Sequence, residues 1–122
     1  MGEYTKSYKD LLVWQRSHLL AKRILELTKT IKRDAISAVI IGQITRSVTS
    51  APANIVEGYY TRRGKQFISY LERSRGSLAE TDYWLFLATD LGYIPRETYP
   101  GLSKEINEII LMLSSLIHKS VN

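Results

Sequence analysis

The sequence contains no cysteine, which excludes disulfide bonds and thiolate metal sites. It also lacks any apolar run of the length that a membrane-spanning helix needs, so no membrane partner is expected. The first residues, MGEYTKSYKDLLVW, are polar and do not contain the apolar stretch of a signal peptide. These absences predict a soluble protein of the cytoplasm.

Histidine is nearly as scarce. His18 and His118 are far apart in the sequence, and neither has a neighbouring group of carboxylates or histidines of the kind that binds metals. We therefore expect two surface histidines, with no metal site and no cofactor. Arg46, Asn54, Glu57 and Glu80 could serve as acids and bases, but this group includes no histidine and no nucleophile. The sequence thus predicts no catalytic residues and a protein that is not an enzyme.

Length and charge set the remaining limits. A chain of 122 residues can bury one core but leaves no room for a second, so a single domain over residues 1–122 is expected. Seventeen Lys and Arg against twelve Asp and Glu give a net charge of +5 and a pI near 9.5. Such a balance favours a polyanion partner such as RNA or DNA, although the same charge can serve solubility alone.

Apolar residues recur at alternating steps of three and four in four segments, the pattern of amphipathic helices. The first helix is expected over about 9–31, the second from Asp34 to about Tyr60 and the third over about 65–91. Pro95 or Pro100 should open the fourth, because proline is tolerated in a first helical turn. Helices of similar length with short connections predict an all-α fold, an antiparallel up-down-up-down four-helix bundle.

Several positions carry more specific expectations. Pro52 should kink the second helix. Gly58 and Gly64 should bound a connecting loop over 58–66. Gly76, in the interior of the third helix, predicts a close backbone contact. The run 83–88, YWLFLA, is apolar nearly all round, so the end of the third helix is expected to contact another subunit as well as its own core.

Two groups of basic residues are candidate nucleic-acid contacts. The first follows the outward side of the first helix, and the second lies in the connecting loop beside Tyr59 and Tyr60, whose rings can stack on unpaired bases. The alternatives are a solvated helix face and an ordinary exposed loop. The candidates are Arg16, Lys22, Arg23, Lys29, Arg62, Arg63 and Lys65.

A polar stripe runs beside the apolar seam of the second helix. Arg46, Ser50, Asn54 and Glu57 recur at helical spacing and are expected to face inward next to the core, where an arginine fork can satisfy carboxylate and amide groups in one hydrogen-bonded network. With Glu80 of the third helix, we interpret these residues as a structural network that fixes helix register. Removing Glu57 or Arg46 should then disturb folding or assembly before it disturbs binding.

Read together, these motifs resemble a known family, the four-helix-bundle proteins encoded by intervening sequences in large-subunit ribosomal RNA genes. The resemblance spans nearly the whole chain, and its most specific parts are the Asn-Ile-x-Glu-Gly and Gly-Ser-x-x-x-Glu runs. The segments that carry it are 11–15, 43–47, Ser50, 54–58, 75–77, Glu80 and 91–94.

The resemblance implies a helical bundle without enzymatic activity, often a ring-like homopentamer and sometimes labelled a ribosomal protein. The chain is also similar in architecture to the accessory protein of diversity-generating retroelements, a basic pentamer that engages a reverse transcriptase and nucleic acid. Two hypotheses follow: an oligomeric bundle that binds RNA or DNA through its basic surface, or a protein-interaction module that recruits a partner such as a reverse transcriptase. Salt separates them, because only phosphate binding must weaken steeply with added salt.

Overall fold

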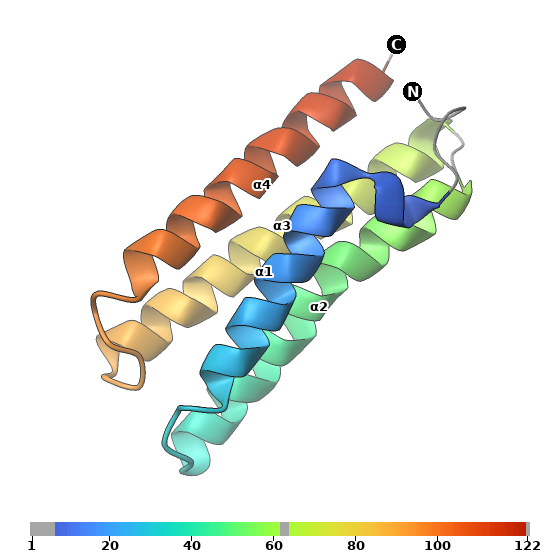
Figure 1. The fold of residues 1–122 in the computed structure, drawn as a ribbon. Helices are drawn as coiled ribbons and strands as arrows, with labels where there is room; N and C mark the ends of the chain where they lie inside the picture. Colours follow the sequence, from blue (N-terminus) through green and yellow to red (C-terminus); the bar gives the residue numbers. More distant parts are fainter. Residues whose placement is uncertain (1–6, 62–63, 122) are drawn as a thin grey trace.

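The computed structural model describes residues 7–61 and 64–121, which form four α-helices after a short 3-10 turn, η2 (Tyr8–Asp10), and contain no strand (Figure 1). The helices are α1 (Leu12–Thr28), α2 (Ala35–Thr61), α3 (Gly64–Asp90) and α4 (Tyr99–Ser120). Consecutive helices run in opposite directions along the bundle (Figure 1). The predicted all-α four-helix bundle is therefore confirmed.

Each helix packs against the helices that precede and follow it in the sequence, and α4 also packs against α1. α2 lies against α1 and α3, and α4 lies against α3 and α1, whereas in the described part of the chain α1 and α3 are diagonal neighbours. The predicted seams form the core of this bundle. On α3, for example, the side chains of Leu71, Ser74, Leu78, Thr81, Leu85 and Ala88 are buried.

The start of α1 differs from the expectation. Residues 8–10 form the separate turn η2, because Ser7 and Asp10 cap it reciprocally: the Ser7 hydroxyl accepts from Lys9 N (3.1 Å) and the Asp10 carboxylate from Ser7 N (3.2 Å). α1 then begins at Leu12 and ends at Thr28, inside the predicted bounds at both ends.

The other helix ends follow the sequence signals. Asp34 accepts hydrogen bonds from Ile36 N (3.0 Å) and Ser37 N (2.8 Å) and so caps α2, as predicted. Gly92 has a φ of 85° just after α3, and Tyr93 N donates back to the Ala88 carbonyl (2.9 Å) in the manner of a Schellman cap. Pro100 lies in the first turn of α4.

Two glycine predictions are wrong. Gly58 does not end α2: it is buried within the helix, where an added Cβ would lie 3.2 Å from the Cβ of Tyr70 on α3, so it permits close helix packing. Gly76 is exposed, and an added Cβ would meet no described atom within 4 Å, so it makes no close backbone contact within the bundle. α2 continues through Pro52, which lies inside the helix.

Candidate nucleic-acid interface

The basic residues of α1 fall into two rows, about 100° apart around the helix. Arg16 and Arg23 are seven residues apart, two helical turns, and both turn toward α4. Lys22 and Lys29 have the same spacing, and Lys22 lines a groove between α1 and α2. The structure thus divides the single stripe that was predicted from the sequence.

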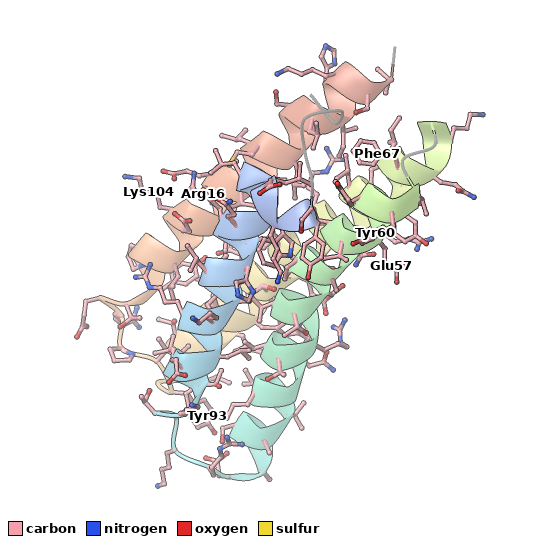
Figure 2. The ribbon with its side chains drawn as sticks, turned by 45° about the vertical axis from the view of Figure 1, so that its right-hand side comes forward. Arg16, Glu57, Tyr60, Phe67, Tyr93 and Lys104 are labelled. Carbon is pink, nitrogen blue, oxygen red and sulfur yellow. The ribbon has the colours of Figure 1, made fainter. Side chains whose placement is uncertain are left out.

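Arg16, which Figure 2 shows beside α4, is held by two carboxylates of that helix. Its Nη2 lies 2.7 Å from both Glu105 Oε1 and Glu108 Oε1, and its Nε donates to Glu105 Oε2 at 3.2 Å. The hydrogen bonds that it donates to Glu105 and then to Glu108 raise the pKa of the guanidinium above its usual value. The structure therefore gives Arg16 a clamping role between α1 and α4, and a phosphate contact by this residue stays a prediction.

The four other candidates that the structure describes are exposed, and three of them have no ionic partner among the described residues. No carboxylate of the described residues lies within ion-pair distance of Lys22, Arg23 or Lys65, whereas Lys29 pairs with Glu26 at 3.1 Å on the surface. An exposed cation without an ionic partner can neutralise a phosphate without first breaking an intramolecular pair.

The connecting segment is shorter than predicted. α2 ends at Thr61 and α3 begins at Gly64, so Tyr59, Tyr60 and Lys65 belong to helices. The candidates Arg62 and Arg63 lie outside the described residues. Tyr60, near the end of α2, contacts Tyr8 of η2 with ring centroids 6.3 Å apart, so the end of α2 lies beside the turn that precedes α1.

An aromatic row runs from this end of the bundle along α1. The rings of Tyr8 and Trp14 pack edge to face, with their centroids 5.0 Å apart. The His18 imidazole stacks on the Trp14 indole, with ring centroids 4.8 Å apart and 9° between the ring planes. Sequence reasoning treated His18 as an isolated surface residue. His18 is exposed, as expected. It follows Trp14 by four residues, which places the two side chains next to each other on the helix surface, and this spacing is the sequence signal for the stack. The contact with Tyr8 has no comparable signal in the sequence.

The predicted polar network divides into parts. Arg46 pairs with Glu80 across α2 and α3 and also donates to Gln43 Oε1 at 2.8 Å. Trp84 Nε1 donates to Glu80 at 3.0 Å, and this bond, with the bond from Arg46, lowers the pKa of Glu80 against a smaller opposing effect of burial. The Arg46 side chain is 56% exposed, so the pair lies at the surface of the bundle.

Asn54 and Glu57 are not part of that pair. The Asn54 amide donates to Ser50 Oγ (2.9 Å), which in turn lies 2.9 Å from Ser77 Oγ on α3. Glu57 is exposed and projects away from the bundle (Figure 2), so the predicted inward stripe of four residues is wrong at this position.

The described residues contain no group of three or more His, Asp or Glu side chains placed to hold a metal ion. None of the helices among them is both long and apolar enough to cross a membrane. What the arrangement offers chemically is exposed positive charge beside stacked aromatic rings.

Comparison with known proteins gives a family match. The family model described as 23S rRNA-intervening sequence protein matches residues 9–115. A crystal structure of a protein of unknown function from the S23 ribosomal protein family of Bacteroides thetaiotaomicron is 34% identical in sequence, with a TM-score of 0.78. The match covers 87% of this chain and 98% of that one. No curated protein matches the chain.

Proposed function

Because the chain belongs to the 23S rRNA-intervening sequence protein family, we propose that it is a non-enzymatic, oligomeric helical bundle that binds RNA or DNA through its exposed basic side chains. The observation that carries the proposal is the exposure of Lys22, Arg23 and Lys65 without a described carboxylate in ion-pair range. The net charge of +5 adds a general attraction for polyanions.

Phosphate contacts of this kind supply affinity and little sequence choice. Each phosphate that a cation neutralises releases counterions, so the logarithm of the association constant falls with the logarithm of salt by about 0.9 per duplex phosphate. The slope of this dependence therefore reports how many of the exposed side chains take part.

The test is binding of the purified protein to a structured RNA and to a matched DNA duplex over a series of salt concentrations. The triple variant Lys22→Ala, Arg23→Ala, Lys65→Ala should lower affinity and reduce the slope by about 2 to 3 on duplex DNA. A triple variant of Arg73, Arg96 and Lys104 to Ala removes the same charge from other exposed positions and should change the slope less. A third variant, Arg62→Ala, Arg63→Ala, Lys65→Ala, tests the segment that was predicted from the sequence.

Two results would overturn the proposal. Absence of binding at low salt would mean that the positive charge serves solubility. Equal losses in the first two triple variants would mean that net charge alone, and not the exposed side chains of α1 and of the start of α3, determines affinity.

A second candidate function is a protein-interaction module. Tyr83 and Phe86 near the end of α3 are 53% and 52% exposed, which is unusual for large rings on a small bundle. A partner such as a reverse transcriptase could dock there, and its binding would change little with salt because apolar contacts are not screened. The same surface suits self-association, and the resemblance to ring-like homopentamers favours a second copy of this chain over a different protein.

A further inference from the structure

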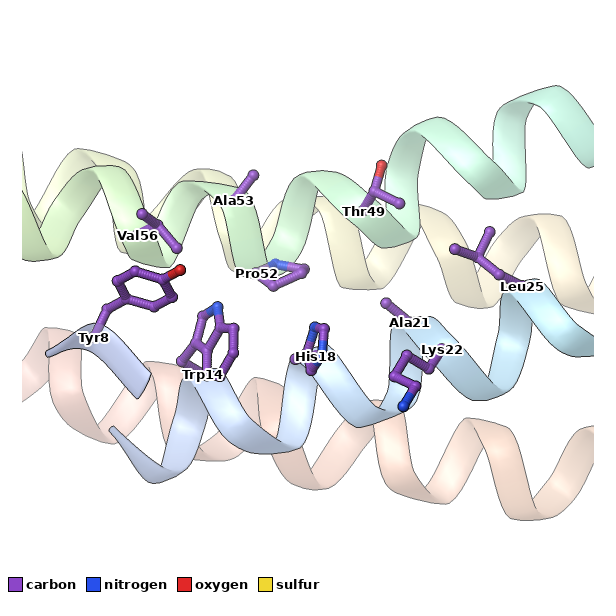
Figure 3. A pocket seen from close by; sticks show the side chains of 10 residues that line it. All are labelled: Tyr8, Trp14, His18, Ala21, Lys22, Leu25, Thr49, Pro52, Ala53 and Val56. Atoms are coloured by element: carbon purple, nitrogen blue, oxygen red, sulfur yellow. The ribbon is translucent and has the colours of Figure 1, made fainter. Parts of the chain in front are cut away.

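The groove between α1 and α2 has aromatic rings along its α1 side, and the proposed phosphate contacts do not explain them. It encloses about 310 Å³ and is lined on the α2 side by small or short side chains, among them Thr49, Pro52 and Ala53. Figure 3 shows Tyr8, Trp14 and His18 following one another on the opposite side, facing α2. The groove is a slot with apolar walls and a stacked aromatic edge.

The rings at both ends of the row are open to solvent. Tyr60, which contacts Tyr8, is 71% exposed, and His18, which covers one face of Trp14, is also exposed. Rings that served only to fill the core would be buried like the apolar seam of α1. The row Tyr60, Tyr8, Trp14 and His18 instead extends an aromatic surface outward from the bundle.

Charge identifies the kind of ligand. None of the residues that line the groove is acidic, and Lys22 stands one helical turn beyond His18 with its ammonium group exposed (Figure 3). A flat apolar surface binds a planar aromatic group, and a cation at its end binds an anion attached to that group. A nucleotide combines the two, with a base for the ring and a phosphate for the lysine.

We propose that the groove and the adjoining Tyr60 bind unpaired nucleotides, with bases stacking on the exposed rings of His18 and Tyr60 and the phosphate next to His18 contacting Lys22. The inference rests on the proposed nucleic-acid binding and deepens it, since it selects single-stranded over paired segments. RNA and DNA both supply this chemistry, and the test below separates them.

The test compares three single strands of about 12 nucleotides, a length within the range such sites cover. They are an oligoadenylate RNA, the matching DNA and an abasic strand with the same number of phosphates. Trp14 is the reporter, in a Trp84→Phe background that leaves it as the only tryptophan. Because the reporter lies in the row, a stacked base should change its emission. The adenylate strands should quench the Trp14 emission and bind at least about tenfold more tightly than the abasic strand.

The variants His18→Ala and Tyr60→Ala should each lose most of that advantage, about tenfold in affinity for the adenylates, with affinity for the abasic strand unchanged. His118→Ala removes the same ring type as His18→Ala from an exposed position outside the groove and should bind like the parent. All three positions are exposed, so circular dichroism and melting should show intact folding.

Each outcome decides a different question. Tighter binding of the RNA would show that the ribose hydroxyl is recognised, and equal binding of both adenylates would show a site for either single strand; both support the inference. Equal affinity for the abasic strand would overturn base stacking and leave phosphate binding intact. Absence of binding by all three strands at low salt would overturn this inference, and, if duplex DNA and structured RNA also fail to bind, the proposed function.

Discussion

At the scale of single residues, Asp34 joins two loops at one end of the bundle. Its carboxylate caps α2 and also accepts the hydroxyl proton of Tyr93, which lies 2.9 Å from both carboxylate oxygens. The bond from Ser37 N and then the bond from Tyr93 lower the pKa of Asp34, and the same contact raises the pKa of Tyr93. One charged group therefore holds the loop before α2 against the segment that follows α3.

Asp34→Asn should lower the free energy of unfolding near neutral pH, by an amount that disappears in acid. Asparagine can still cap the helix, so the change isolates the charge. Because the pKa is lowered in the folded state, the stabilisation is complete above the unfolded pKa near 3.8 and is lost as pH falls through the lower folded pKa. Urea unfolding of both proteins at a series of pH values measures the difference.

Tyr93→Phe is the companion variant, because it removes one donor and leaves the two backbone donors in place. The free energy of unfolding should fall less in Tyr93→Phe than in Asp34→Asn, and the difference from wild type should disappear over the same acid range. If the difference in the free energy of unfolding between wild type and Asp34→Asn stays constant with pH, the charge of Asp34 does not stabilise the fold.

At the scale of helices, α1 is joined to α4 by the Arg16 clamp, with hollows on either side. One hollow, of about 500 Å³, lies between the start of α1 and the end of α4, and another, of about 320 Å³, lies between the end of α1 and the start of α4. The Arg16 side chain, 29% exposed, thus lies between two loosely packed stretches. Its contribution should be to helix packing.

Arg16→Ala should lower the free energy of unfolding by about 1 kcal/mol, because it leaves Glu105 and Glu108 without their shared cation. Arg23→Ala removes the same charge from the same helix without breaking an ion pair among the described residues and should be nearly neutral. Urea unfolding measures both. In the binding assay the order should reverse, with Arg23→Ala reducing the salt slope. A stable Arg16→Ala protein with weakened RNA binding would instead support the phosphate contact that the sequence suggested.

α2 packs closely against α3 at Gly58, and Gly42 of the same helix provides a control. Gly42 is exposed with no atom within 4 Å of an added Cβ, so Gly42→Ala should stabilise the protein by about 0.5–1 kcal/mol through helix propensity. Gly58→Ala has the same propensity gain but should be destabilising, because the Cβ of Tyr70 at 3.2 Å is fixed to the α3 backbone. Thermal melting compares them, and equal stabilisation by both changes would disprove the close approach.

These glycines also show where sequence reasoning ends. The period of apolar residues was enough to predict the helices and their buried faces, because a helical repeat fixes which side chains share a face. It could not tell Gly58 from Gly76, since a glycine is needed only where a neighbouring helix comes close, and the neighbour is a property of the fold. Trp14 and His18 could have been paired from their spacing, whereas Tyr8 and Tyr60 are far apart in sequence and meet only in the folded chain.

At the scale of the whole molecule, the outer face of α3 suits contact with another copy. Gly76, Ala79 and Tyr83 are exposed and spaced by three and four, so small residues lie beside a large ring on one side of the helix. A flat strip next to an aromatic side chain allows a neighbouring subunit to approach closely. Gly76 makes no close contact inside the bundle. A contact with a neighbouring subunit would explain why this position is a glycine.

We expect the wild-type protein to have a mass several times that of the 14.0 kDa chain, and five times that mass if it forms the homopentamer that the resemblance implies. Tyr83→Glu should shift the mass toward a single chain while circular dichroism stays helical, because a carboxylate buried without a partner in an interface is costly. Leu19→Glu places the same charge at an exposed apolar position of α1 and should leave the mass unchanged. Light scattering after gel filtration measures all three proteins. A wild-type mass of 14.0 kDa would leave the face of α3 open for a different partner, and equal dissociation by both variants would place the contact elsewhere.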